Sequence, residues 1–255
     1  MSTPLGFLVD DQFLDELAER IDTEGVACIK NGVNSESLMR WQKQLDVYLE
    51  KQGQRYFSMI QPWQEPNSSY GELARDDNFK RLLSGLTLRG APGRKAEGSI
   101  YNVLRVVAGA KGSEKSMMFH YDASVVTVLI PLQIPEGSPE DCGDLVAFPN
   151  ARPIRRSSLL NALEKLLVQN PISRRIMAQR IKKRSNDENI FRLSPGDIYV
   201  FWGYRTLHAN LSCKPHSLRA TLLFHHGDPH LGSLTTRFIK WTRRVRERHN
   251  LKARF

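Results

Sequence analysis

The chain has 255 residues, 40% of them hydrophobic, and a formal net charge of +10. This length and apolar content suffice for a sizeable core, so we expect one domain over residues 1–255. No window approaches eighteen uncharged apolar residues, and the first residues lack the pattern of a secretory signal. We therefore expect a cytoplasmic protein without a membrane-spanning helix.

The three cysteines, Cys28, Cys142 and Cys213, are widely spaced and form no C-x-x-C pair. Zinc sites and redox motifs usually place cysteines in such close pairs. We therefore expect buried or inert thiols.

A helical region is expected over residues 1–90. Asp10 or Asp11 can cap a first helix, because the apolar residues that follow recur with a period of 3.6. Asn34 or Ser35 can open a second helix with a similar apolar stripe. Neither helix carries a catalytic motif, so both are interpreted as packing elements.

Short segments rich in β-branched and aromatic residues predict strands along much of the chain. They cover residues 26–29, 99–108, 123–134, 144–148, 197–202 and 218–225. Several short strands separated by turns favour a β-sandwich or barrel over a parallel sheet. The predicted fold class is mainly β with flanking helices.

Positive charge is concentrated in two segments. Residues 152–184 carry ten Lys or Arg against one acid, and residues 237–255 carry eight against one, which leaves the remainder of the chain net negative. We expect a basic helical insertion at about 152–190 and a basic amphipathic C-terminal helix at about 234–250. These segments predict an anionic partner; solvated helix faces are the alternative.

Metal chemistry is predicted at His120, Asp122 and His208. On an extended strand, residues i and i+2 point the same way, so His120 and Asp122 can bind one ion. His208 follows shortly after the predicted strand at 197–202. Two histidines and one carboxylate are typical ligands of iron(II) and leave coordination positions open.

A binding site for a carboxylate is predicted at Arg219, whose planar guanidinium can bind such a group at two points. Thr221 faces the same side of the strand and can donate a second hydrogen bond. Arg219 follows His208 across a turn, so the two residues can lie near each other. Other candidates for the second histidine ligand sit at or beyond Arg219 on the following strand: His225, His226 and His230.

The segments His120-Tyr121-Asp122, His208 and Arg219-Ala220-Thr221 resemble the iron(II)/2-oxoglutarate-dependent dioxygenase superfamily, in its prolyl-hydroxylase-like and phytanoyl-CoA-dioxygenase-like branches. The resemblance covers roughly residues 97–226. It implies a double-stranded β-helix, or jelly roll, that binds Fe(II), uses 2-oxoglutarate as co-substrate and consumes O2. In that scheme the two histidines and the aspartate hold the iron, and Arg219 with Thr221 holds the far carboxylate of 2-oxoglutarate.

One family feature is absent. A tyrosine that binds 2-oxoglutarate in some relatives would fall near Val106 in this chain. By strand alternation, Tyr101, Asn102 or Arg105 is expected to take its place.

The resemblance implies a hydroxylase, and the basic segments favour an anionic substrate, lipid-linked or a sugar, such as Kdo of lipopolysaccharide. They also suggest peripheral contact with the anionic inner face of a membrane. A nucleic-acid demethylase of the same superfamily is one alternative, but such relatives carry another arginine where this chain has His225. Nucleic acid is therefore not the expected partner. A non-catalytic jelly-roll binding module is the other alternative.

Overall fold

The computed structural model describes residues 3–53, 55–93, 98–108, 116–138, 141–151 and 189–229. The predicted basic insertion lies outside these residues, except for its last two positions. The predicted C-terminal helix, at about 234–250, lies wholly outside them.

The helices described all come from the first ninety residues. They are α1 (Asp11–Glu24), α2 (Ser35–Gln52), the 3-10 turn η1 (Pro62–Gln64), α3 (Gly71–Arg75) and α4 (Asp77–Gly90). Asp10 caps α1 by accepting from the Phe13 amide at 2.8 Å, and Asn34 caps α2 by accepting from the Ser37 amide at 2.8 Å. The two predicted helix starts are therefore confirmed.

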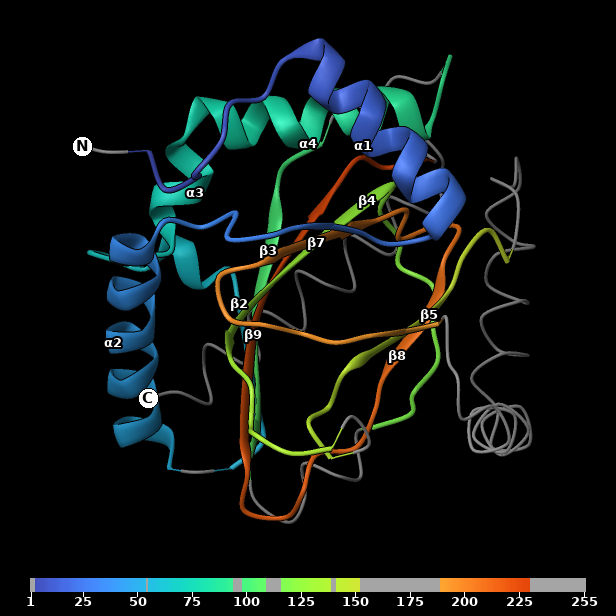
Figure 1. Ribbon diagram of the computed structural model, residues 1–255. Coiled ribbons are helices and arrows are strands. Elements are labelled where there is room, and N and C mark those ends of the chain that lie inside the picture. The colour runs from blue at the N-terminus through green and yellow to red at the C-terminus, as the bar shows by residue number, and fades with distance from the viewer. Residues whose placement is uncertain are drawn as a thin grey trace, which may run out of the picture.

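Within the described residues, nine strands form two antiparallel sheets, whose arrangement can be followed in Figure 1. The strands are β1 (Ala27–Ile29), β2 (Phe57–Ile60), β3 (Tyr101–Ala108), β4 (Val126–Gln133), β5 (Leu145–Phe148), β6 (Ile190–Phe191), β7 (Ile198–Phe201), β8 (Leu207–Asn210) and β9 (Leu218–His226). The larger sheet has the order β1-β7-β4-β9-β3-β2 and the smaller one β6-β5-β8. The predicted fold class is confirmed: the protein is mainly β, and its sheets form a double-stranded β-helix with flanking helices.

Strand alternation decides which side chains reach the space between the sheets. In β9, Ala220, Leu222 and Phe224 join the large core shared with the helices. The alternate residues of β9, from Arg219 to His225, line a pocket on the other face. Because helices cover the first face and the smaller sheet covers the second, β4, β7 and β9 are buried on both sides.

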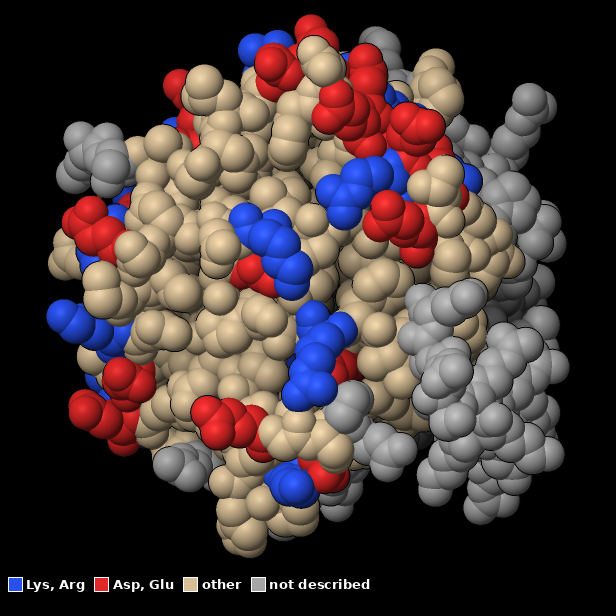
Figure 2. Space-filling model, viewed as in Figure 1, with Lys and Arg blue, Asp and Glu red and all other residues tan. Residues whose placement is uncertain are grey.

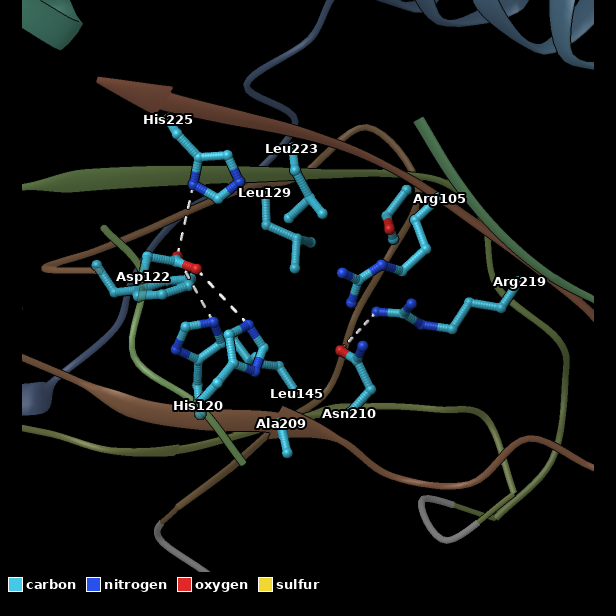
Figure 3. Close-up of a pocket in the computed structure, with 13 residues that line it drawn as sticks. Arg105, His120, Asp122, Leu129, Leu145, Ala209, Asn210, Arg219, Leu223 and His225 are labelled. Carbon is cyan, nitrogen blue, oxygen red and sulfur yellow. Dashed lines mark hydrogen bonds and ion pairs between the residues drawn. The ribbon is translucent and has the colours of Figure 1, made fainter. Parts of the chain in front are cut away.

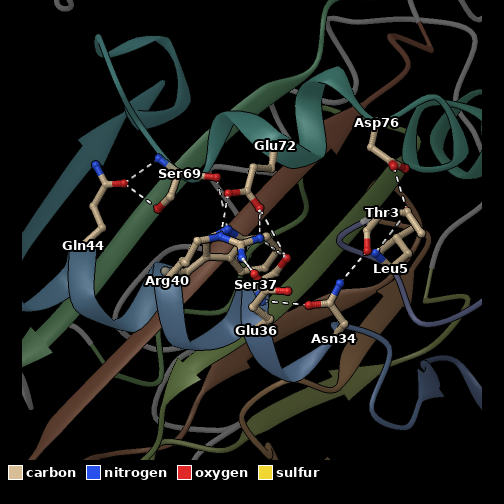
Figure 4. Close-up of polar contacts among 11 residues, drawn as sticks. Thr3, Leu5, Asn34, Glu36, Ser37, Arg40, Gln44, Ser69, Glu72 and Asp76 are labelled. Atoms are coloured by element: carbon tan, nitrogen blue, oxygen red, sulfur yellow. Dashed lines mark hydrogen bonds and ion pairs between the residues drawn. The ribbon is translucent and has the colours of Figure 1, made fainter. Parts of the chain in front are cut away.

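Polar contacts fasten α2 to the segment that leads into α4 (Figure 4). Arg40 of α2 makes a two-point contact with Glu72 of α3, with N···O distances of 3.0 and 2.9 Å. Gln44 accepts from both the amide and the hydroxyl of Ser69. These contacts hold the helices outside the larger sheet, away from the pocket.

Acidic side chains gather around α1 on the face shown in Figure 2. The helix itself contributes Asp11, Asp15, Glu16, Glu19, Asp22 and Glu24, against the single base Arg20. This matches the net negative charge that the sequence leaves outside its two basic segments. Within the part of the chain that the structure describes, no helix is long and apolar enough to cross a membrane.

Candidate metal centre and anion pocket

His120 lies on the segment before β4 and faces His208 of β8 through an isolated antiparallel bridge. Their backbones exchange two hydrogen bonds, with N···O distances of 3.0 and 3.1 Å, and their ring centroids lie 4.3 Å apart. His208 follows β7 in the chain, as expected, but it lies on a strand that the sequence did not predict, β8. Its four residues, Leu-His-Ala-Asn, include no β-branched or aromatic side chain that would indicate a strand.

Asp122 completes a cluster of three metal-binding side chains. Its carboxylate oxygens lie 3.6 Å from His120 Nε2 and 3.6 Å from His208 Nε2. One ligand atom from each residue falls within 4.8 Å of the others. The sequence motif and the strand pairing thus place all three predicted ligands around one point.

The backbone orients both imidazoles toward that point. His120 Nδ1 lies 2.9 Å from the Met118 carbonyl, and His208 Nδ1 lies 3.1 Å from the Thr206 carbonyl. A carbonyl oxygen only accepts, so each Nδ1 carries the proton and each Nε2 keeps its lone pair. A hydrogen bond from the second ring nitrogen to a backbone carbonyl is typical of histidines that bind metal.

The electrostatics suit a divalent cation. Burial and, to a smaller extent, the neighbouring His208 lower the pKa of His120 to about 4. Burial likewise lowers the pKa of His208, so both rings are neutral at pH 7. Burial alone would raise the pKa of Asp122, but the surrounding histidines and the Thr127 hydroxyl hold it well below its ordinary value. The cluster therefore offers two neutral nitrogens and one carboxylate.

Three further residues hold the Asp122 carboxylate. Thr127 donates to Oδ2 at 2.5 Å, and His225 Nδ1 lies 3.5 Å from the same oxygen. Gly203 provides the space, because a Cβ there would fall 3.0 Å from Asp122 Oδ2 and even closer to the Thr127 hydroxyl. These contacts fix the carboxylate on the side that faces the histidines.

Arg219 lies at the other end of the same pocket (Figure 3). Its side chain is 1% exposed, and it donates from Nη2 to Asn210 Oδ1 at 3.0 Å. Its Nε and Nη1, and the hydroxyl of Thr221, are buried without a hydrogen-bond partner in the described structure. Buried donors left unpaired are costly, so this end of the pocket is built for an acceptor that the chain itself does not supply.

The charge of Arg219 persists despite its burial. Desolvation lowers its pKa to about 10, which still leaves the guanidinium fully charged at pH 7. The pocket encloses about 410 Å³, its open mouth included, between the metal cluster and this cation. A small dianion could therefore bridge the two ends.

Gly143 makes room for Arg219. It adopts φ +73°, and a Cβ at this position would fall 2.6 Å from Arg219 Cδ and 2.5 Å from Cys213 Sγ. Gly93 has the same φ but open space around it. Alanine substitutions at the two glycines therefore distinguish the free-energy cost of the backbone conformation from the cost of steric crowding.

We predict that Gly143→Ala lowers the free energy of unfolding by about 2–4 kcal/mol, because it adds crowding to left-handed strain. Gly93→Ala should cost only about 1–2 kcal/mol, from the backbone alone. Urea denaturation of both variants measures the difference. Equal losses would show that Arg219 and Cys213 move aside freely.

Three residues were predicted as further 2-oxoglutarate contacts, and the structure places only one of them, Arg105, in the lining of the pocket. Tyr101 does not line it, although its ring lies 6.0 Å from that of His225. Asn102 alternates with Arg105 on β3, donates to the Leu223 carbonyl at 3.0 Å, and does not line the pocket.

Several residues that shape the site were not predicted from the sequence, and His225 was considered only as an alternative metal ligand. Asn210 stands two positions after His208 on β8, so strand alternation would have indicated a shared face. Thr127 and His225 are cross-strand partners on β4 and β9, and no local signal links them. Gly143 and Gly203 were not recognised, because the side chains for which they make room are distant in sequence.

Solved structures with the same fold include several non-haem oxygenases. EctD from S. alaskensis with bound Fe gives a TM-score of 0.58 at 14% identity, over 89% of this chain and 82% of that one. A prolyl hydroxylase from Trichoplax adhaerens, in complex with a hypoxia-inducible-factor peptide, gives 0.54 at 14% identity, over 88% and 94%. This chain therefore shares the fold of these oxygenases.

Enzymes that catalyse different reactions share this fold. SnoK, a non-haem α-ketoglutarate-dependent carbocyclase from nogalamycin biosynthesis, matches with a TM-score of 0.51 at 16% identity, over 88% of each chain. No family model matches this sequence, and no curated protein is significantly similar to it. The comparisons therefore establish the fold, whereas the substrate and the reaction are inferred from the residues of the pocket.

Proposed function

We propose that this protein is an iron(II)- and 2-oxoglutarate-dependent oxygenase that hydroxylates a C–H bond of an anionic substrate. One observation carries the proposal: a single pocket joins the His120, Asp122 and His208 cluster to the buried, incompletely paired Arg219. Either feature alone is common in proteins. Together they fit a co-substrate that binds metal at one end and presents a carboxylate at the other.

The residues fit both groups. His120, Asp122 and His208 would hold iron(II), while Arg219 and Thr221 would hold the far carboxylate of 2-oxoglutarate. When bound, iron(II) and 2-oxoglutarate would activate O2 and supply the oxidising power for hydroxylation. Asn210 would orient the guanidinium, and Thr127 would hold the Asp122 carboxylate. The apolar wall formed by Leu129, Leu145, Phe201 and Leu223 would limit water in the pocket.

The substrate is proposed to be an acidic sugar or an acidic lipid-linked molecule, with Kdo of lipopolysaccharide as the first compound to assay. The basic segments at 152–184 and 237–255 support an anionic substrate through their charge. They would also support peripheral binding at the inner face of a membrane. Sedimentation with anionic vesicles at low and high salt tests that contact, and no binding at either salt concentration would exclude it.

The cofactor assignment is tested by anaerobic spectroscopy. Wild-type protein with iron(II) and 2-oxoglutarate should show the weak visible metal-to-ligand charge-transfer band. His208→Ala should lose the band, and Arg219→Ala should require more 2-oxoglutarate to form it. His216→Asn is the matched control, because His216 is exposed in a turn at φ +66°, which Asn tolerates. No band and no iron binding in the wild type would instead favour a non-catalytic binding module.

A further inference from the structure

A second arginine, Arg105, enters the pocket from β3. Its register partner is Thr221 on β9, so its side chain emerges next to the proposed carboxylate site. The residues beside it, Leu104 and Val106, belong to the core shared with the helices, which turns Arg105 toward the pocket. Figure 3 shows its guanidinium extending into the space between the metal cluster and Arg219.

Arg105 has no partner within the described part of the chain. Its Nε is buried and unpaired, and no carboxylate of the described residues forms an ion pair with it. Other arginines differ: Arg40 pairs with Glu72, Arg89 with Asp15, and Arg205 with Asp22. A cation held unpaired in a pocket is an expected feature of a binding site for an anion.

The charge of the assembled site leaves Arg105 unbalanced. The charges of iron(II) and Arg219 would be cancelled by Asp122 and the two carboxylates of 2-oxoglutarate. Arg105 then adds one positive charge that no described group of the pocket compensates. Binding one further negative charge would make the site neutral.

The two arginines differ in burial, and this difference places Arg105 nearer to the pocket entrance, where a substrate would bind. Arg219 is almost fully buried at the inner end of the pocket, whereas Arg105 is half-buried and therefore nearer to solvent. A co-substrate that extends from the metal to Arg219 would fill the inner end. A molecule entering afterwards would meet Arg105.

We infer that Arg105 binds a carboxylate of the primary substrate and thereby selects acidic over neutral molecules. This inference rests on the proposed function. The same chemistry has a second source, since Arg105 could bind the metal-side carboxylate of 2-oxoglutarate. The experiment therefore needs one arm for each source.

The first arm measures 2-oxoglutarate affinity by anaerobic titration of the charge-transfer band. Arg105→Gln should keep the band and change the affinity by less than about threefold, whereas Arg219→Gln should weaken it by about tenfold or more. A loss in Arg105→Gln equal to that in Arg219→Gln would assign Arg105 to the co-substrate and overturn the inference. Absence of the band in the wild type would be a failure of the proposed function instead.

The second arm uses a panel of sugar and amino carboxylic acids, each paired with its neutral methyl ester, and measures succinate formation. An acid, but not its ester, should stimulate the wild type. Arg105→Gln should lose this stimulation by about tenfold or more, Arg105→Lys should recover part of it, and Arg205→Gln should behave as wild type. If esters act as well as acids, if no acid acts, or if Arg105→Gln responds normally, the inference is wrong.

Discussion

Asp122→Ala is expected to abolish turnover of 2-oxoglutarate and to weaken iron(II) binding severely. The substitution removes the only carboxylate in the described metal cluster, leaving two neutral imidazoles to hold a divalent cation. Succinate formation should fall by about a thousandfold or more, since the metal performs the difficult step of the reaction. Iron affinity is measured separately by titration under anaerobic conditions.

Two further variants provide an intermediate loss and a control against which the effect of Asp122→Ala can be compared. Thr127→Val keeps the side-chain shape but removes the 2.5 Å hydrogen bond to Asp122, and should cost about tenfold to a hundredfold in iron affinity or activity. Asp141→Ala removes a carboxylate that pairs with exposed Lys214 outside the pocket, and should leave activity unchanged. Full activity in Asp122→Ala would refute the ligand assignment.

Arg219→Lys is expected to raise the apparent Michaelis constant for 2-oxoglutarate by roughly tenfold to a hundredfold. Lysine keeps the positive charge but replaces the planar fork with a single ammonium, so two-point contact with a carboxylate is lost. The Asn210 amide would also lose the partner that now lies 3.0 Å away. Initial rates over a range of 2-oxoglutarate concentrations provide the measurement.

Arg205→Lys is the control for this substitution, because Arg205 pairs with Asp22 at 3.1 Å and does not line the pocket. Its Michaelis constant should match that of the wild type. Thr221→Val should fall between the two, since it removes one donor and leaves the guanidinium in place. An unchanged constant in Arg219→Lys would show that the carboxylate binds elsewhere.

The two ends of the pocket are formed by different parts of the fold. His208 comes from β8 of the smaller sheet, His120 and Asp122 come from the segment that precedes β4, and the carboxylate-binding residues come from β9 of the larger sheet. The pocket therefore depends on how the two sheets face each other. Although they have no side chain, Gly143 and Gly203 affect this geometry, because Gly143 makes room for Arg219 and Gly203 makes room for Asp122.

The sequence by itself determined the local features. Helix caps at Asp10 and Asn34 could be predicted because a side-chain acceptor satisfies amides within three residues. The shared face of Arg219 and Thr221 followed from the two-residue period of a strand. The pairing of His120 with Asp122 was predicted in the same way.

Only the tertiary structure decided which distant residues meet. It placed His208 opposite His120, set Thr127 beside Asp122, and turned Arg105 rather than Asn102 toward the pocket. The physical reason is that β3 has apolar residues on both faces, Val103 and Val107 on one and Leu104 and Val106 on the other, so its sequence pattern does not indicate which face lines a cavity. Strand pairing resolves this by fixing register across residues far apart in the chain.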